Sequence, residues 1–360
     1  MAKLKVAVIF GGYSSEHEVS LLSAYSVMQN MAPEKYEIIK IGITKKGRWL
    51  YYPGPLEQVK DGTWETHPDC VPAIISPDRT TKGIIKLEAA SATTQKIDVV
   101  FPVLHGKNGE DGTIQGLFTL AGIPYVGCGV LSSAVCMDKE VANTLLEGAG
   151  LAHAKWLCKN LQALNDFDAA EAEIAAYLGY PIFVKPANAG SSVGVSKADD
   201  KEALRAAISL ALAHDHKVIF EQAIDGQEIE CAVLGNEQAI ASLPGEIVSS
   251  NHEFYDYEAK YISGASTEII PADIGEEKLA EVQAAALKAY AVLGCSGLTR
   301  ADFFLERGTG RVLVNELNTL PGFTQFSMYS KLMAASGVPY PEVVDRLIDL
   351  AFARQEGNHA

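Results

Sequence analysis

The sequence predicts an α/β protein that begins with a small doubly wound domain built on a parallel sheet, and three observations indicate this. The apolar run Val6–Phe10 is followed by two glycines and then by a helical pattern. Further apolar runs lie at 37–43 and at 97–104, and the last of them ends at His105. Such an alternation of strand, loop and helix is typical of doubly wound domains, because parallel strands need crossover connections. We expect this domain to span residues 1–127.

The remaining elements are predicted in chain order. The first helix has apolar side chains at positions 19, 22, 25 and 28, which is helical spacing. Residues 45–95 show a weak pattern with several prolines and glycines, so we interpret them as an irregular insertion. A central domain is expected over 128–220 and a C-terminal domain over 221–360. Their predicted elements are a helix at 132–148, strands at 182–185, 193–195 and 218–221, a helix at 201–213, a β-hairpin around 309 and a final helix from 341.

The composition argues against several classes of partner. A formal net charge of −15 disfavours nucleic acid or an anionic membrane as the main partner. The six cysteines are scattered without a C-x-x-C pair, which favours reduced thiols over a disulfide or zinc framework. The first apolar run is too short for a signal peptide, and no apolar run reaches the length of a membrane span. We therefore expect a cytoplasmic protein with no nucleic-acid or membrane partner.

The predicted hairpin near the C-terminus brings polar side chains together. If its turn is centred on Thr309, Asp302 lies opposite Glu316. The same register places Arg300 opposite Asn318. Because side chains alternate along a strand, these four would share one face. Two carboxylates and a carboxamide are oxygen ligands that suit Mg²⁺.

A solvated polar face on an edge hairpin is the alternative to this metal site. The metal site is favoured because the same register places Phe304, Val312 and Val314 on that face. Apolar neighbours of this kind imply a partly buried cleft rather than an open surface.

A loop rich in Gly and Ser at 185–194 lies between two predicted strands. It contains no G-x-x-x-x-G-K-[ST] motif, but its small residues would let backbone N–H groups close over phosphates. Lys185 would supply a positive charge, and Lys139 in Met-Asp-Lys would supply a second. An ordinary hairpin tip is the alternative for this loop.

The segment after the strand at 218–221 could bind a nucleotide base and its sugar. The backbone of a linker around Ile224 can hydrogen-bond an adenine edge, and Glu221 or Glu228 can accept from ribose hydroxyls. Two exposed acids are the alternative for this pair.

Five blocks of sequence then carry a resemblance to a known family. In this order along nearly the whole chain, they are similar to the D-alanine–D-alanine ligases of the ATP-grasp superfamily, which implies an N-terminal doubly wound domain followed by a two-part ATP-grasp fold. The blocks are Gly11-Gly12-Tyr13-Ser14-Ser15-Glu16, His105-Gly106-Lys107-Asn108-Gly109-Glu110-Asp111-Gly112, Lys185-Pro186 with Gly190-Ser191-Ser192-Val193-Gly194, Phe254–Tyr261, and Asn315-Glu316-Leu317-Asn318-Thr319-Leu320-Pro321-Gly322.

The resemblance implies an ATP-dependent reaction of small molecules. The carboxylate of one D-alanine attacks the γ-phosphate of ATP, and the amine of a second D-alanine attacks the resulting acyl phosphate, as needed for peptidoglycan precursors. Two Mg²⁺ ions, which Mn²⁺ can replace, and a homodimer are also implied. Ligases that make D-alanyl-D-lactate or D-alanyl-D-serine, and a module that binds nucleotide without turnover, remain alternatives.

The resemblance also assigns roles to residues. Glu16 would anchor the ammonium group of the first D-alanine, although an acid in the first turn of a helix is a common alternative. His105 would either line the site or belong to the N-terminal scaffold. Arg300 and the Gly322 amide would donate to the oxyanion, and Lys260 and Ser327 would bind the carboxylate of the second D-alanine. Ser191 and Tyr261 would form a hydrogen-bond network with Glu16. The residues implied around ATP are Lys139, Lys185, Phe254 and Phe304, and those implied on the metal ions are Asp302, Glu316 and Asn318.

Overall fold

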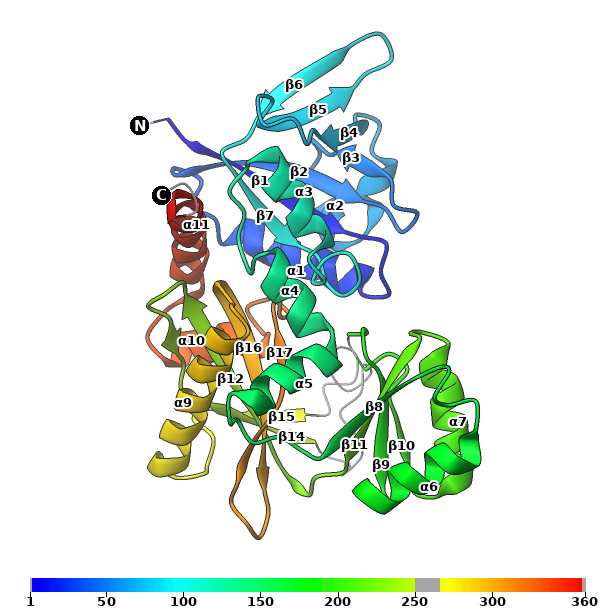
Figure 1. The fold of residues 1–360 in the computed structure, drawn as a ribbon. Helices are drawn as coiled ribbons and strands as arrows, with labels where there is room; N and C mark the ends of the chain where they lie inside the picture. Colours follow the sequence, from blue (N-terminus) through cyan, green and yellow to red (C-terminus); the bar gives the residue numbers. More distant parts are fainter. Residues whose placement is uncertain (1, 191, 250–265, 358–360) are drawn as a thin grey trace.

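A computed structural model describes residues 2–190, 192–249 and 266–357 (Figure 1). Three β-sheets follow one another along the chain. The N-terminal sheet has the strand order β6-β5-β4-β3-β2-β1-β7, and only the pairs that β1 makes with β2 and with β7 are parallel. Its strands are β1 Leu4–Gly11, β2 Tyr36–Ile43, β3 Trp49–Tyr51, β4 Val71–Ile75, β5 Gly83–Leu87, β6 Ala92–Lys96 and β7 Val99–Val103.

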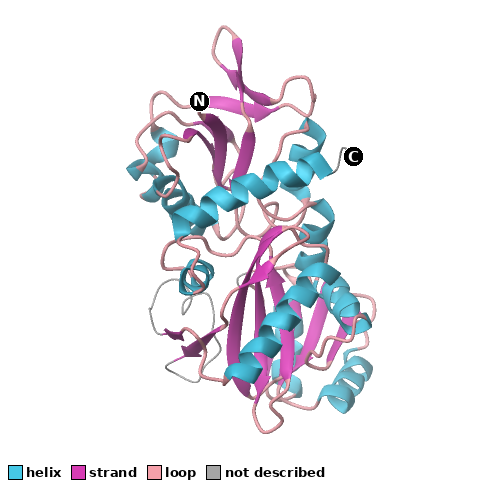
Figure 2. Cartoon of the chain, turned by 90° about the vertical axis from the view of Figure 1, so that its left-hand side faces the viewer, coloured by secondary structure: helices cyan, strands magenta, loops and turns pink. Residues whose placement is uncertain are grey.

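Helices cover both faces of the parallel part of this sheet, as predicted. On β1, Val6 and Val8 pack with α1 (His17–Gln29) and with the last helix, α11 (Tyr340–Gly357). Ala7 and Ile9 pack on the other face with α3 (Thr113–Ala121). Figure 2 shows α11, which leads to the C-terminus, lying beside the N-terminal sheet.

The interpretation of residues 45–95 as irregular was wrong. They contain four strands, β3 to β6, together with α2 (Glu57–Lys60) and a 3-10 helix (Thr63–Thr66). The strands are only three to five residues long, and β6 is mostly exposed. Short strands with exposed side chains give little hydrophobic alternation, so the sequence pattern was weak.

The central sheet is antiparallel, in the order β10-β9-β11-β8. The residues at 193–195, predicted as a strand, form a turn and an unassigned position, and the strand begins at Ser196. Two helices pack on one face and bury Ile174 and Leu204 against the sheet. The elements are β8 Trp156–Asn160, β9 Ile182–Pro186, β10 Ser196–Ala198, β11 Lys217–Gln222, α6 Phe167–Leu178 and α7 Lys201–Leu212.

The single helix predicted at 132–148 is in fact two, α4 (Val130–Met137) and α5 (Lys139–Gly148). Asp138 has an extended ψ of 101° and its carboxylate accepts from the backbone N–H groups of Glu140 and Val141. An Asp at this position is a favourable N-cap, so a new helix starts there. The break places Lys139 on the first turn of α5.

The C-terminal sheet has the order β15-β14-β12-β16-β17, with β13 paired to β12. One face packs on α9, and the other face packs on α10 and α11. The elements are β12 Gly226–Gly235, β13 Ile240–Ala241, β14 Gly245–Ser249, β15 Ser266–Ile269, β16 Gly297–Glu306, β17 Val312–Asn318, α9 Glu276–Val292 and α10 Met328–Ala335.

The predicted register of the hairpin β16–β17 is confirmed at its polar end and wrong at its apolar end. Asp302 pairs with Glu316 and Arg300 pairs with Asn318. The register then shifts between Asp302 and Phe303, so that Phe303 pairs with Val314. This β-bulge turns Val312 and Val314 into the core beneath α9 instead of onto the face of Asp302.

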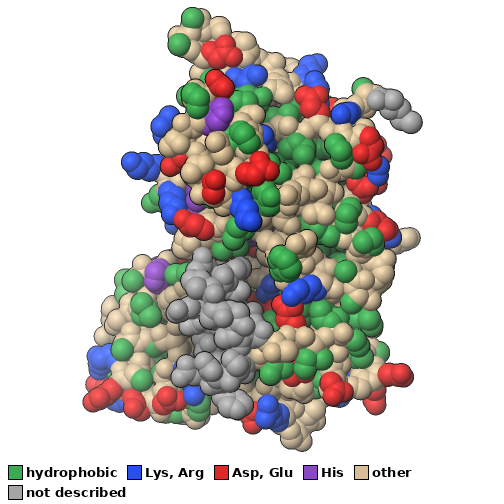
Figure 3. Space-filling model, turned by 180° about the vertical axis from the view of Figure 1, so that it is seen from behind, with side chains coloured by type: hydrophobic (Ala, Val, Ile, Leu, Met, Phe, Trp, Pro, Cys, Tyr) green, Lys and Arg blue, Asp and Glu red, His purple; other side chains and the backbone are tan. Residues whose placement is uncertain are grey.

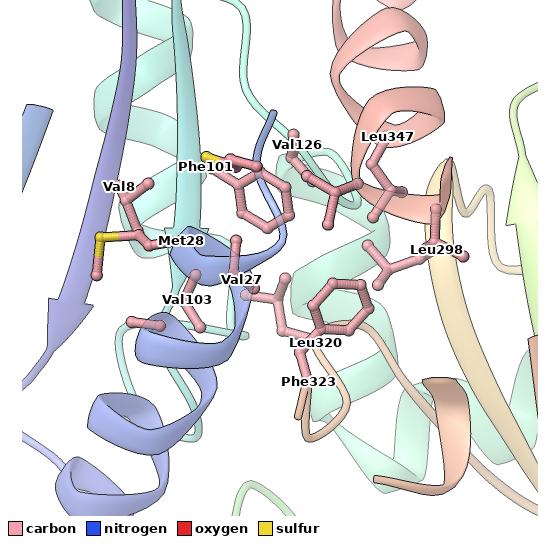
Figure 4. Packing of buried hydrophobic residues seen from close by; sticks show 14 of the residues in the cluster. Val8, Val27, Met28, Phe101, Val103, Val126, Leu298, Leu320, Phe323 and Leu347 are labelled. Atoms are coloured by element: carbon pink, nitrogen blue, oxygen red, sulfur yellow. The ribbon is translucent and has the colours of Figure 1, made fainter. Parts of the chain in front are cut away.

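One buried core joins the N-terminal sheet to the C-terminal part of the chain (Figure 4). Phe101 of β7 and Phe323 of the loop after β17 have ring centroids 6.2 Å apart. Leu320 and Leu347 belong to the same cluster. The loop after β17 is therefore packed against the N-terminal domain by its side chains.

All six cysteines are free, and Sγ of Cys136 lies 3.7 Å from Sγ of Cys295. On the face seen in Figure 3, acidic and basic side chains are interspersed. Among the described residues, no helix has the length and apolar character needed to cross a bilayer.

Candidate active site

Two cavities lie side by side in the molecule. The first has a volume of about 610 Å³ and lies between the central and C-terminal sheets. The second has a volume of about 560 Å³ and lies between α1 and the C-terminal sheet. Four residues line both cavities, namely Glu110, Gly190, Glu316 and Asn318. The two cavities therefore share a wall.

Three lysines line the first cavity, namely Lys139, Lys185 and Lys197. Lys185 is the second-last residue of β9, and its Nζ lies 2.5 Å from Oε2 of Glu221. Burial alone would lower the pKa of Lys185, but the negative charge of Glu221 and its neighbours offsets this and raises the pKa. Nζ of Lys139 donates to the carbonyl of Ala189 over 2.9 Å and lies 3.5 Å from Oε2 of Glu316. Two cations from different elements suit a polyphosphate.

The loop that follows Lys185 is anchored by Asn188. Its backbone N–H and its Nδ2 donate to Oδ2 of Asp215 over 2.8 and 2.9 Å. The Asn188 side chain thus fixes the base of the loop and does not line the first cavity. Contacts from this loop to a ligand would have to come from its backbone and serines.

The segment between β11 and β12 closes another side of the first cavity. Glu221, Ile224, Glu228 and Phe304 all line this cavity. The Glu221 side chain is only 12% exposed, so the alternative interpretation of Glu221 and Glu228 as two exposed acids does not hold. Neither the N–H nor the C=O of Ile224 is hydrogen-bonded to another residue that the structure describes, so both are open to the edge of a base.

The polar face of the β16–β17 hairpin lies where the two cavities meet. Nε and Nη2 of Arg300 donate to the two carboxylate oxygens of Asp302, each over 2.7 Å. Nδ2 of Asn318 donates to Oδ2 of Asp302 over 2.9 Å. Within the described ranges, no group of three His, Cys, Asp or Glu side chains could hold a metal ion. A cation here would depend on the Asn318 carboxamide and on ligand oxygens as well as on Asp302 and Glu316.

A buried carboxylate lines the second cavity. Glu16 is the N-cap of α1 and is only 5% exposed. Gly106 has a φ of +68°, and a Cβ at this position would lie 2.2 Å from Oε2 of Glu16. Only glycine is compatible with this close approach. Gly322 and Ser327 line the same cavity, and Oγ of Ser327 accepts from the N–H of Thr324 over 3.0 Å.

His105 is buried at the edge of the second cavity, with 4% exposure. Its Nδ1 lies 2.9 Å from the carbonyl oxygen of Leu320, and its Nε2 lies 3.1 Å from Oγ of Ser23. Burial lowers the pKa of His105. Because both ring nitrogens are engaged by the protein, the geometry favours the scaffold role over direct contact with a ligand.

Comparisons with known proteins agree with this geometry. A model of the D-Ala D-Ala ligase N-terminus matches residues 5–128, and a model of the D-Ala D-Ala ligase C-terminus matches residues 145–349. The D-alanine–D-alanine ligase of Caldicellulosiruptor bescii is 53% identical over 98% of this chain and 96% of its own length. This chain belongs to the D-alanine–D-alanine ligase family.

Solved structures of the family confirm the predicted fold. The D-Ala:D-Ser ligase VanG of Enterococcus faecalis superposes with a TM-score of 0.89 and 44% identity, covering 97% of this chain and all of that one. The D-alanine–D-alanine ligase of Coxiella burnetii gives a TM-score of 0.87 and 34% identity, covering 100% and 97%. The central and C-terminal sheets are therefore the two parts of an ATP-grasp fold, as predicted.

Two residues of the ligase chain lie in the cavity walls without having been predicted there. Glu230 on β12 pairs with Asp302, and its Oε2 lies 3.0 Å from Nε of Arg300. Nothing in its local sequence placed β12 beside β16. Glu110 lines both cavities, and its position in the Gly-Glu-Asp-Gly block was the available signal.

Four predicted site residues of this ligase chain, Ser191, Phe254, Lys260 and Tyr261, lie outside the described residues.

Proposed function

We propose that this chain joins two D-alanines into D-alanyl-D-alanine with hydrolysis of ATP to ADP and phosphate, for peptidoglycan precursors. One observation carries the proposal. A cavity with three lysines and an open linker backbone shares a wall with a cavity that contains a buried carboxylate and an arginine. The first suits ATP and the second suits two amino acids, so the γ-phosphate and a substrate carboxylate can meet at the shared wall.

The chain's own groups would position each step. In the first step a carboxylate oxygen of the first D-alanine bonds to the γ-phosphorus, the bond to the bridging oxygen breaks, and ADP leaves. Lys139 and Lys185 would hold the phosphates, and Glu16 would hold the substrate ammonium. Electrostatic positioning of this kind is the main requirement of phosphoryl transfer.

In the second step the amine of the second D-alanine attacks the acyl carbon of the acyl phosphate, and the proton that the nitrogen loses passes to the departing phosphate. The tetrahedral intermediate then expels inorganic phosphate, leaving the peptide bond. Arg300 and the Gly322 N–H would donate to the oxyanion, and Ser327 with Lys260 would hold the second carboxylate. Ser191 and Tyr261 are proposed to bond with Glu16.

The oxygen donors of Asp302, Glu316 and Asn318 fit two Mg²⁺ ions, or Mn²⁺, because hard cations take carboxylate and carboxamide oxygens. Bound there, the ions would neutralise charge on the β- and γ-phosphates. Asn318 would present Oδ1 to a cation, because its Nδ2 is the donor in the bond to Asp302.

Ile224, Phe254 and Phe304 are proposed to bind the adenine base. Glu221 or Glu228 is proposed to accept from the ribose hydroxyls. We also propose the three domains 1–127, 128–220 and 221–360, a homodimer and a cytoplasmic location. Size-exclusion chromatography with light scattering tests the homodimer, which is contradicted by a monomeric mass at working concentrations.

The decisive experiment measures phosphate release from ATP with D-alanine, with L-alanine, and with no amino acid. Phosphate release that depends on D-alanine, with the dipeptide identified by mass spectrometry, is the expected result. ATP binding without release would instead indicate a non-catalytic nucleotide-binding module.

A D-alanyl-D-serine ligase is the second candidate, because the D-Ala:D-Ser ligase VanG is 44% identical to this chain in sequence. Competition between equal D-alanine and D-serine, with both dipeptides quantified, separates the two functions. A predominance of the D-serine product would replace the first proposal.

A further inference from the structure

The loop from Leu320 to Phe323 joins β17 to α10 and lines the second cavity with Leu320, Pro321 and Gly322. Pro321 has no N–H. The N–H of Gly322 donates to no acceptor among the residues that the structure describes, whereas the N–H groups on either side of this dipeptide are both bonded. The loop therefore presents one open amide next to the cavity.

The peptide groups of Leu320 are fixed from the N-terminal domain. Its N–H donates to Oε1 of Glu110 over 3.1 Å, and its carbonyl oxygen lies 2.9 Å from Nδ1 of His105. Oε2 of Glu110 accepts from the N–H of Gly106 over 2.7 Å, which ties the carboxyl group to its own loop. Leu320 is thus bonded on both sides by residues more than 200 positions earlier in the chain.

A chain of hydrogen bonds runs from His105 through Ser23 to Phe323, and it determines which atom of each pair carries the proton. A carbonyl can only accept, so Nδ1 of His105 carries the proton and Nε2 of the neutral ring accepts from Oγ of Ser23. Ser23 can then accept from the N–H of Phe323, 3.3 Å away. The carbonyl of Phe323 accepts from the hydroxyl of Tyr340 over 2.6 Å. Each of these donors and acceptors has one consistent role.

Side-chain packing supports the same loop. Leu320 and Phe323 are 7% and 3% exposed and belong to the core shared with β7 and α1, where Figure 4 shows them beside Phe101 and Val27. Backbone groups on both sides of Gly322 are therefore held by hydrogen bonds and by packing, and its position is set before any ligand binds.

We propose that His105 and Glu110 are positioning residues for catalysis, which hold the Gly322 N–H where it can donate to the tetrahedral oxyanion. The proposal rests on the proposed ligase function, in which Gly322 is an oxyanion donor. Preorganised donors stabilise developing charge without reorganisation, and an error of about 1 Å in position can cost on the order of 100-fold in rate. The N-terminal domain would thereby complete a catalytic group that the C-terminal domain carries.

The test compares His105→Ala with His105→Asn, and Glu110→Ala with Glu110→Gln. Asn can place an amide donor near the position of Nδ1, and Gln keeps one acceptor oxygen. We expect the alanine variants to lose kcat by about tenfold or more, while the KM values for ATP and D-alanine change less than threefold, since ground-state contacts remain. Asn and Gln should recover part of kcat. A phosphinate dipeptide analogue with tetrahedral phosphorus should bind more weakly in proportion to the loss of kcat.

Asp111→Asn is the matched control, because Asp111 accepts only from Asn108 and Thr113 of its own loop among the bonds that the structure gives. It should keep kcat. A wild-type kcat in both alanine variants overturns the proposal. So does a kcat of His105→Asn and Glu110→Gln that is no higher than that of the alanine variants at the same positions. If thermal unfolding shows that an alanine variant does not fold, the matching Asn or Gln variant is compared with the wild type instead. A lower kcat with a proportional loss of analogue affinity then supports the proposal, and wild-type values of both overturn it. Absence of dipeptide from the wild type would instead reject the ligase function itself.

Discussion

Glu316 on β17 lies directly opposite Asp302 on β16, and a β-bulge follows at the next pair. The bulge leaves the two carboxylates facing each other while the strands beyond it turn their valines into the core. Bulges are common where a strand must re-aim a side chain beside an active site. Here the bulge allows one hairpin to serve both the core and the cavity wall.

Glu316→Gln should reduce turnover by about 100-fold or more, because one anionic ligand of the proposed cation site is lost. The fold should be unchanged, since the Glu316 side chain is 30% exposed and faces cavities. Steady-state phosphate release over a series of Mg²⁺ concentrations checks this. Glu306→Gln, beside the turn of the same hairpin and paired with Arg311 away from both cavities, is the control. Normal turnover of Glu316→Gln at saturating Mg²⁺ would remove Glu316 from the site.

Lys185→Ala should raise the KM for ATP and lower kcat, with a total loss in kcat/KM of roughly 10- to 100-fold, the value of one charge-assisted bond of about 1.5–3 kcal/mol. Lys185→Met retains an apolar stem beside Glu221 and separates loss of charge from loss of packing. Lys201→Ala, on the half-exposed α7 lysine, should leave both constants unchanged. An ATP response that is the same in all three variants would make the loop after β9 an ordinary hairpin tip.

The features that sequence alone could predict depend on local periodicity. The polar end of the hairpin followed from alternation around Thr309, and the strand β1 followed from its apolar run. The bulge after Asp302 could not be predicted, because it leaves no mark in the alternation of apolar and polar residues along the two strands. Glu230 was missed for a related reason, since its pairing with Asp302 joins strands about 70 residues apart in sequence. Long-range pairings of this kind are set by the whole sheet.

Stability should depend on the protonation of Glu110. Burial, followed by the nearby charge of Glu16, raises the pKa of Glu110 to about 8. An unfolded Glu ionises near pH 4.3, so between about pH 4.5 and 8 the folded state keeps a proton that the unfolded state has lost, and stability falls as pH rises through this window, by at most about 1.4 kcal/mol per unit.

Glu110→Gln removes this titration, so the free energy of unfolding of the variant should improve relative to wild type as pH increases through the same window. Urea unfolding at several pH values measures the difference. Glu88→Gln, at an exposed turn, should show no such trend. A difference between Glu110→Gln and wild type that is independent of pH would mean that Glu110 is already ionised in the folded protein.

L-Alanine should be rejected as the first substrate by about 10- to 200-fold. Glu16 and the oxyanion donors would fix the ammonium and carboxylate groups, so the methyl group of the other enantiomer must point into protein. Space around Glu16 is limited, since a Cβ at Gly190 would already lie 3.3 Å from its Oε2. A misplaced methyl group costs roughly 1–3 kcal/mol. The rate of ADP release, measured with each enantiomer, reports acyl-phosphate formation and tests this prediction. Equal rates with the two enantiomers would point to another ATP-grasp ligase.

The choice of second substrate should depend on Tyr261. Free D-alanine carries an ammonium group at neutral pH, whereas D-lactate is nearly isosteric and lacks that charge. The family resemblance implies a different residue here, such as His or Phe, in members that make the depsipeptide. A His can become cationic near pH 6–7 and would repel the ammonium group, but a Tyr stays neutral until about pH 10.

The wild type should therefore make D-alanyl-D-alanine at pH 7 with D-lactate in equal supply, and Tyr261→Phe should admit more D-lactate because the proposed bond to Ser191 is lost. Chromatographic separation of products from mixed substrates, over about pH 6 to 9, measures both. Because Tyr is uncharged across this range, the product ratio of the wild type should vary little below about pH 8. A depsipeptide that predominates at pH 7 would contradict both the role of Tyr261 and the assignment of D-alanine as second substrate.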